Sequence, residues 1–154
     1  MKATESEFLS FTFTGKKVRW AQKCLGRFKY RILKRRWGVS MQHRLHKLAQ
    51  YIRGWMGYFR LSEYYRPIPL LDQWIRRRIR CCFLKQWRKP KTRFKNLVRL
   101  GVDKVNAAKI AASSKGYYRL SITYAVQQAL NNSYLAKIGL VSLKDLWIRF
   151  HHHR

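Results

Sequence analysis

Residues 40–60 read SMQHRLHKLAQYIRGWMGYFR, and their apolar side chains recur at the spacing of an α-helix. Ser40 precedes the first apolar position and suits the N-cap, so we expect a helix from Met41 to Arg60. One apolar stripe collects Met41, Leu45, Leu48, Ile52, Trp55, Met56 and Phe59. A helix with such a stripe buries it against other elements, and this segment therefore indicates a mainly α fold.

Two glycines, Gly54 and Gly57, interrupt the polar side of this predicted helix. Each costs about 1 kcal/mol relative to alanine in a helix interior. Without a side chain at these positions, another backbone can come close. Tight helix–helix packing is the more common reason for such glycines, and the close approach of a sugar–phosphate strand is the alternative.

A β-hairpin is predicted ahead of this helix, over residues 9–20. Leu9, Phe11 and Phe13 alternate with polar residues and would share one face of a strand. Gly15-Lys16 suits a two-residue turn, and the four residues after it suit the returning strand. A lone hairpin is marginally stable in water, so this one needs a surface to pack on.

A second long helix is predicted over residues 70–88, after Arg66-Pro67-Ile68-Pro69 breaks the preceding pattern. Its apolar arc consists of Ile75, Ile79, Cys82 and Phe83. Five arginines and one lysine lie between positions 76 and 88, and no acidic residue lies among them. Ion pairs within the helix cannot account for these cations, so we expect contacts with phosphate rather than a merely solvated face.

The remaining segments are shorter. Residues 21–36 are basic and suit a helix that ends at Trp37-Gly38, and Lys89-Pro90-Lys91 is the expected subdomain boundary. Further helices are predicted at 92–100, 103–113, 121–131 and 142–150, with Ser121 and Ser142 as caps and Gly139 closing one more short helix. The predicted organisation is a hairpin at 1–20, a helical bundle at 21–88 and a small helical subdomain at 89–154.

The charge of the chain indicates its partner. There are 35 Lys and Arg against six Asp and Glu, a formal net charge of +29 on 154 residues. So much like charge opposes a compact state unless a polyanion neutralises it, and the commonest polyanion is nucleic acid. Hydrophobic residues make up 47% and aromatic residues 15%, too much for a disordered basic tail. The composition therefore predicts a folded nucleic-acid-binding domain.

Other classes of protein find less support. No apolar run approaches the roughly 20 residues of a membrane span, and the spacing of Cys24, Cys81 and Cys82 favours reduced thiols in a cytoplasmic protein. The carboxylates are scattered, whereas a two-metal centre needs them to converge. No cysteine or carboxylate near His43 and His46 completes a metal site. We therefore expect no metal, no cofactor and no catalysis by this chain.

Aromatic residues interleave with the cations. Tyr64-Tyr65 lies beside Arg66, and Tyr117-Tyr118 lies beside Arg119, in segments predicted to be non-helical and exposed. Exposed rings can stack on unpaired bases, so these tyrosines are candidates for base or sugar contacts. The tryptophans lie mostly on helix faces and are expected in the core.

Several segments together resemble the group II intron reverse transcriptases, and the resemblance covers nearly the whole chain. Residues 8–15, F-L-S-F-T-F-T-G, are similar to the end of the palm, which often reads F-L-G-F. Residues 52–60, I-R-G-W-M-G-Y-F-R, are similar to the maturase-specific region, where G-W-x-x-Y-[FY] is typical. Residues 71–80 resemble the helix that follows there. The segment ending at 139–147 resembles the DNA-binding extension of compact bacterial members.

The resemblance implies the thumb-like and maturase part of a polymerase, which supports splicing by binding RNA. The family's Tyr-x-Asp-Asp sequence would precede residue 8, and this chain begins too late to include it. Ser10 stands where glycine is usual. The implied partners are group II intron RNA, target DNA or a template–primer duplex, and a polymerase palm supplied by another chain.

Contacts with RNA are expected at Lys47, Arg53, Gly54, Gly57, Arg60, Tyr64, Tyr65, Arg66, Arg76, Arg77, Arg78, Arg80, Lys85 and Arg88. Contacts with DNA are expected at Lys89, Lys91, Arg93, Lys95, Lys115, Tyr117, Tyr118 and Arg119. Two other interpretations fit the composition. One is a structural RNA-binding protein of ribosomal type, and the other is a membrane-active cationic helical protein.

Overall fold

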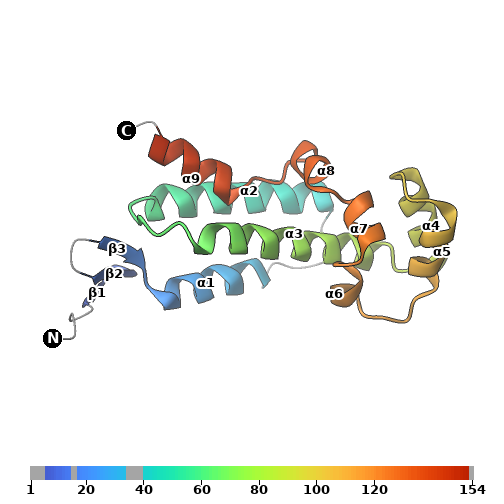
Figure 1. Ribbon diagram of the computed structural model, residues 1–154, viewed down its shortest axis with the longest axis horizontal. Helices are drawn as coiled ribbons and strands as arrows, with labels where there is room; N and C mark the ends of the chain where they lie inside the picture. The colour runs from blue at the N-terminus through green and yellow to red at the C-terminus, as the bar shows by residue number, and fades with distance from the viewer. Residues whose placement is uncertain (1–5, 15–16, 34–39, 153–154) are drawn as a thin grey trace. The chain divides into compact units, whose positions relative to one another are not determined.

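The computed structural model describes residues 6–14, 17–33 and 40–152, and its elements are drawn in Figure 1. The strands in these ranges are β1 (Ser6–Phe8), β2 (Phe11–Thr14) and β3 (Lys17–Trp20). The helices are α1 (Gln22–Leu33), α2 (Met41–Phe59), α3 (Pro67–Gln86), α4 (Pro90–Arg99), α5 (Lys104–Ala112), α6 (Tyr117–Leu120), α7 (Tyr124–Ala129), α8 (Asn132–Lys137) and α9 (Leu143–His152). The predicted mainly α fold with an N-terminal hairpin is confirmed.

Packing divides the chain into two compact units. The first unit is Met1–Asp72 together with Val141–Arg154, and the second unit is Gln73–Leu140. The C-terminal segment therefore packs with the N-terminal part of the chain. The division by function into 1–20, 21–88 and 89–154 stays a prediction.

Helix α2 is the long amphipathic helix expected from the sequence. The Ser40 hydroxyl accepts a 3.3 Å hydrogen bond from the backbone N–H of His43, which confirms the predicted N-cap. The predicted stripe is buried at Met41, Leu45, Leu48, Ile52, Trp55 and Met56, and Phe59 is half-buried. The apolar stripe is therefore the core of the first unit.

The sheet has three antiparallel strands in the order β1-β2-β3, one more strand than the predicted hairpin. Leu9 and Ser10 form the two-residue turn between β1 and β2, with φ of 48° and 69°. The prediction that Leu9 lies in a strand is therefore wrong. Left-handed conformations at both turn positions usually select Gly or Asn, and their absence here hid the turn. The turn predicted at Gly15-Lys16 lies outside the described residues.

The sheet packs on the C-terminal end of α2. The Phe11 ring lies 5.4 Å from the Phe59 ring, and the Trp20 ring lies 5.4 Å from the Trp55 ring, both between centroids. The Trp20 indole N–H donates a 2.9 Å hydrogen bond to the carbonyl oxygen of Phe59. Phe28 of α1 packs on the same Trp55 ring at 4.6 Å. These contacts supply the surface that a marginal hairpin needs.

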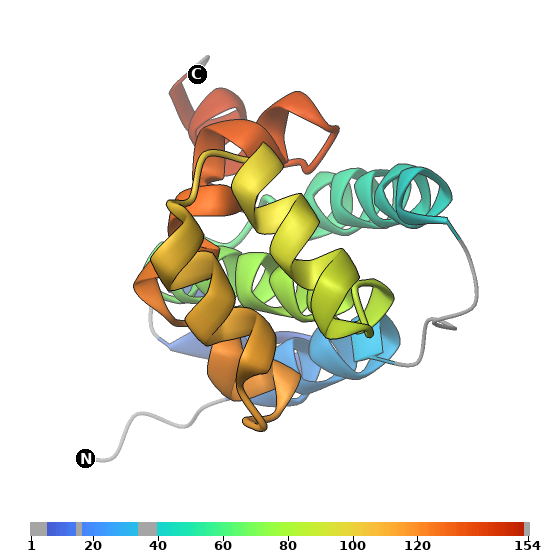
Figure 2. The same ribbon diagram turned by 90° about the vertical axis from the view of Figure 1, so that its right-hand side faces the viewer.

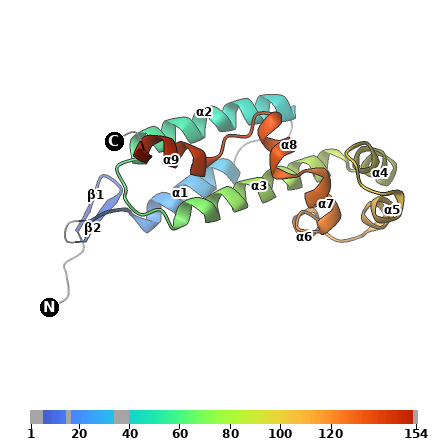
Figure 3. The same cartoon turned by 45° about the horizontal axis from the view of Figure 1, so that its top comes forward.

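Helix α3 begins at Pro67, three residues before the predicted start. The predicted break lies just before Pro67, since residues 62–65 are non-helical, and both prolines belong to the first turn of α3. Proline is tolerated in the first turn of a helix, because its missing N–H has no partner there in any case. Asp72 of this helix is buried and caps α9, which lies along α2 (Figures 1 and 3).

In the second unit, α4 and α5 pack side by side (Figure 2). Gly101 connects them with a φ of 96°, which favours glycine, and the Asp103 side chain caps α5. Gly139 follows α8 with a φ of 110°, as predicted. The expected cap at Ser121 is wrong: Ser121 ends α6, and its hydroxyl donates a 2.6 Å hydrogen bond to the Tyr118 carbonyl oxygen.

Candidate nucleic-acid interface

The arginines of α3 divide into buried and half-buried side chains. Arg80 is 8% exposed, and its guanidinium donates hydrogen bonds to the Leu130 carbonyl oxygen (2.9 Å) and the Asn132 side-chain oxygen (3.1 Å). Burial lowers the pKa of Arg80, and the charge of Arg76 lowers it further. Arg80, expected to contact RNA, is therefore buried, and its side chain joins α3 to the segment between α7 and α8.

Arg77 is also used inside the second unit. Its guanidinium donates hydrogen bonds to the Tyr118 carbonyl oxygen (3.1 Å) and the Ser121 hydroxyl (3.4 Å). Its terminal carbon lies 3.5 Å from the centroid of the Tyr118 ring. Arg77 therefore fixes α6 on α3 and is half-buried, as are Arg76 and Arg78.

Arg93, predicted as a DNA contact, is 5% exposed. It donates a 3.4 Å hydrogen bond to the Ile110 carbonyl oxygen and lies over the Tyr117 ring at 5.8 Å. A buried guanidinium needs such partners. Arg93 therefore joins α4 to the end of α5, which the sequence pattern did not indicate.

The other predicted cations lie on the surface. In the first unit these are Lys47, Arg53, Arg60 and Arg66. In the second unit they are Lys85, Arg88, Lys89, Lys91, Lys95, Lys115 and Arg119. Within each unit, these side chains are placed where a polyanion can reach them.

Helix α1 presents a basic surface that the site prediction missed. Cys24 and Phe28, one turn apart, are buried, while Lys23, Arg27, Lys29 and Arg31 are exposed. This basic surface could have been found from the sequence, because the four cations surround Cys24 and Phe28, two apolar residues spaced by one helical turn. These four cations extend the candidate interface of the first unit.

The outer face of α2 contains Gly54 and Gly57, and both are exposed. A Cβ atom placed on either glycine meets no atom of the described residues within 4 Å. Tight packing of another helix of this chain, the more common explanation, is therefore wrong for the described part of the chain. The exposed Lys47 and Arg53 flank these glycines on the same helix.

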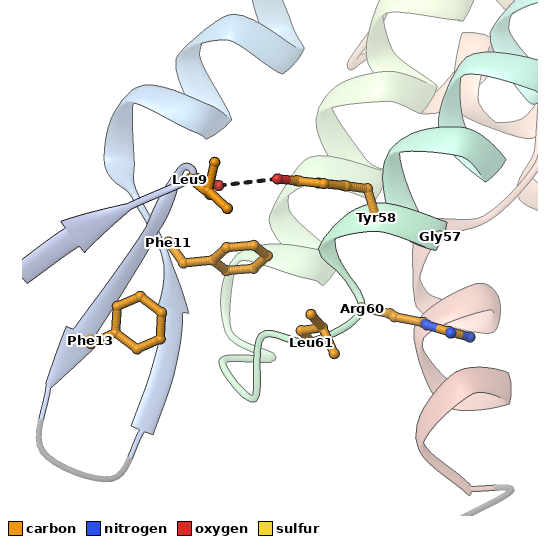
Figure 4. Close-up of a pocket in the computed structure, with 7 residues that line it drawn as sticks. All are labelled: Leu9, Phe11, Phe13, Gly57, Tyr58, Arg60 and Leu61. Atoms are coloured by element: carbon orange, nitrogen blue, oxygen red, sulfur yellow. Dashed lines mark hydrogen bonds between the residues drawn. The ribbon is translucent and has the colours of Figure 1, made fainter.

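A cavity of about 430 Å³ lies where the sheet meets the end of α2 (Figure 4). Its lining consists of Leu9, Phe11, Phe13, Gly57, Tyr58, Arg60 and Leu61. The Tyr58 hydroxyl donates a 3.5 Å hydrogen bond to the Leu9 carbonyl oxygen across the cavity. The lining is mostly apolar. Arg60 lines it as well, but its guanidinium points away from the other lining side chains and lies 5.1 Å from the centroid of the Phe150 ring.

The predicted tyrosines are partly used by the fold. Tyr64 lies under Arg19 at 5.0 Å, and Tyr65 lies 4.8 Å from the Trp147 ring. Tyr64 and Tyr65 follow α2 in a non-helical segment, as expected, but both are half-buried rather than exposed. Tyr117 and Tyr118 start α6 instead, so their predicted non-helical conformation is wrong, although Tyr118 is 47% exposed.

In the described part of the chain, no group of three or more His, Cys, Asp or Glu side chains could hold a metal ion. Asp72 and Asp103 cap helices, and hydrogen bonds from Asn106 lower the pKa of Asp103. Among the described helices, none is long and apolar enough for a membrane span.

Comparison with known proteins gives one family match. The family model described as group II intron, maturase-specific domain matches residues 21–101, just over half of the chain. The match extends from the start of α1 to the Gly101 turn after α4. No curated protein matches the sequence.

Proposed function

Because this chain belongs to the family of group II intron maturase-specific domains, we propose that it binds group II intron RNA and helps this RNA to reach its splicing-competent fold. Its role is to hold RNA, and the reacting groups of splicing belong to the RNA itself. This role fits the resemblance of the wider chain to group II intron reverse transcriptases.

The observation that supports this function best is where the exposed cations lie within the matched residues. Lys23, Arg27, Lys29 and Arg31 lie on α1, and Lys47 and Arg53 lie on α2. Folded RNA brings phosphate backbones together, and cations at these points neutralise them and release counterions. Recognition is then by charge and shape, as is common for structured RNA.

Gly54 and Gly57 contribute to the same surface in this proposal. Since no described part of the chain fills the space above them, a sugar–phosphate backbone can approach the helix closely. The exposed Arg53 lies beside them. Arginine matches phosphate with two parallel hydrogen bonds, so a strand that crosses α2 here gains both contact and charge.

The exposed cations after α3 are assigned to DNA in this proposal. They are Lys89, Lys91, Lys95, Lys115 and Arg119. The contacts would be to the phosphate backbone of target DNA or of a template–primer duplex. Arg93 is excluded from this set because it is buried.

A splicing assay tests the function. At a magnesium concentration too low for a group II intron to splice alone, the protein should restore splicing. Lys47→Glu combined with Arg53→Glu should abolish this rescue, because two exposed phosphate contacts become repulsive. Lys109→Glu combined with Lys137→Glu makes the same change in charge on exposed residues outside the proposed sites and should rescue normally. No rescue by the unaltered protein contradicts the function.

Strand extension is not part of the proposed function. The described carboxylates that are buried or capping have structural partners, and no described cluster could hold the two metal ions that polymerases use. The chain, given a primed template, deoxynucleotides and Mg²⁺, should extend nothing. Extension that persists after removal of contaminating polymerases contradicts this.

A further inference from the structure

The cavity between the sheet and α2 has an apolar lining, four of whose side chains are exposed. Leu9 is 63% exposed, Leu61 56%, Tyr58 52% and Phe13 36%. Figure 4 shows the rings of Phe11 and Phe13 on the sheet side and that of Tyr58 on the helix side. A contiguous group of exposed apolar side chains around one cavity is typical of a binding site.

The volume of the cavity suits a small planar group. About 430 Å³ lies within the range of roughly 300–1,000 Å³ typical of small-molecule sites. Phe13 and Tyr58 expose their rings and can stack on such a group or pack against its edge, whereas Phe11 is buried against Tyr58 and Phe59. Few polar groups face the cavity, so a bound group would be recognised by stacking rather than by its hydrogen-bonding edge.

The positive charge on this face of α2 favours an anionic ligand. Arg60 lines the cavity, and the exposed Arg53 lies on the same face of α2, because positions 53, 57 and 60 are spaced by four and three residues. A second copy of a chain with a net charge of +29 would be repelled from this face. A ligand that fits both the apolar cavity and the positive charge beside it has a flat apolar group joined to phosphates.

We propose that this cavity binds the base of an unpaired nucleotide in the bound RNA. The base lies among Phe13, Tyr58 and Leu61, its sugar passes over Gly57, and its phosphates face Arg53. This inference rests on the proposed function, and it specifies that the first unit binds unpaired nucleotides of the RNA. Because stacking tolerates every base, the cavity prefers unpaired nucleotides over paired ones without selecting a base.

The test compares two RNA hairpins that differ only in one bulged nucleotide, which is a fluorescent purine analogue. The unaltered protein should bind the bulged hairpin more tightly than the fully paired one and should quench the analogue. Leu61→Ser removes part of the cavity wall and should reduce this preference by roughly fivefold, because apolar contact with the base is lost. Leu70→Ser is the matched control, a leucine of α3 that is 62% exposed and lies outside the cavity.

A second variant guards against a simple loss of folding. Gly57→Leu fills the space above the helix and replaces glycine with a better helix former, so the protein should stay folded while the preference disappears. Equal binding of both hairpins by the unaltered protein overturns the base site and leaves the RNA-binding function intact. If Leu61→Ser loses binding to both hairpins, the base site is also overturned. The base site is likewise overturned if the unaltered protein self-associates and Leu61→Ser abolishes this self-association. No binding of either hairpin or of intron RNA contradicts the proposed function itself.

Discussion

The carboxylate of Asp72 in α3 accepts a 2.8 Å hydrogen bond from the backbone N–H of Leu143, 71 positions further along the chain. Its second oxygen accepts hydrogen bonds from the Lys144 N–H (3.0 Å) and the Ser142 hydroxyl (2.8 Å). The N–H groups in the first turn of a helix have no intrahelical partners, and the positive end of the helix dipole stabilises a buried carboxylate. One side chain thus joins the C-terminal helix to the N-terminal part of the first unit.

Asp72→Ala should lower the free energy of unfolding by about 2 kcal/mol, because N–H groups at the start of α9 lose their partner. Asp145→Ala is the control, since Asp145 is exposed in the first turn of the same helix and should cost only a few tenths. Urea denaturation followed by circular dichroism measures both. An equal decrease in the free energy of unfolding in the two variants would show that the Asp72 cap stabilises the fold no more than an exposed carboxylate does.

Arg80→Leu should destabilise the second unit by roughly 1–3 kcal/mol, because the carbonyl oxygen of Leu130 loses a buried donor. Arg88→Leu removes an exposed arginine just after the same helix and should leave unfolding within about 0.5 kcal/mol of the unaltered protein. Thermal melts distinguish the two. If Arg88→Leu melts lower than Arg80→Leu, the assignment of Arg80 to the interior is wrong.

Leu48→Asp tests the core of the first unit. Leu48 is 2% exposed in the centre of the α2 stripe, and an unpaired buried carboxylate there costs several kcal/mol of the roughly 5–15 kcal/mol that stabilise a small domain. The variant should lose most of its cooperative unfolding transition. A transition of unchanged midpoint would contradict the inward orientation of this stripe.

Alkaline pH should destabilise the protein through Cys24. Burial raises the pKa of this thiol from 9.0 to about 11, so the folded protein keeps a proton that the unfolded chain releases. The stability that the neutral thiol contributes is therefore complete below pH 9 and is lost as the pH rises through about 11. Cys24→Ala should flatten this part of the stability profile. If the stability of Cys24→Ala falls with pH in the same way, other titrating groups cause the loss of stability at alkaline pH.

Binding of structured RNA should depend steeply on salt. If six or more phosphates are contacted, affinity should fall roughly 10³-fold or more between about 50 and 200 mM salt, taking the slope for duplex DNA as a guide. Arg53→Glu should make the slope shallower, since Arg53 is exposed on the outer face of α2. Filter binding at several salt concentrations measures both slopes. An isotherm that is indifferent to salt would contradict the electrostatic part of the account.

Local patterns predicted much of this fold. The α2 stripe, its Ser40 cap and the glycine that closes the helix before position 139 follow from periodicity and from the usual capping residues. The Leu9-Ser10 turn escaped because its residues lack the usual turn chemistry. Asp72 capping α9 could not be found from sequence, because such a contact depends on which distant segments the fold brings together.

The candidate site was predicted less completely, for a related reason. Counting cations cannot separate those that bind a partner from those that bind the protein's own carbonyl oxygens. Arg77, Arg80 and Arg93 each donate to a backbone carbonyl of their own unit, and the last two are buried. A charge reversal at Arg77 should therefore destabilise the contact between α3 and α6.

A competition between two RNAs of equal length at moderate salt tests whether the protein recognises group II intron RNA. One is a folded group II intron, and the other is a ribosomal RNA fragment with the same number of phosphates. Since non-specific attraction is then matched, the account predicts that the protein retains the intron RNA preferentially and that Lys47→Glu with Arg53→Glu removes this preference. Equal retention of the two RNAs by the unaltered protein would contradict the maturase function and favour a general RNA-binding role.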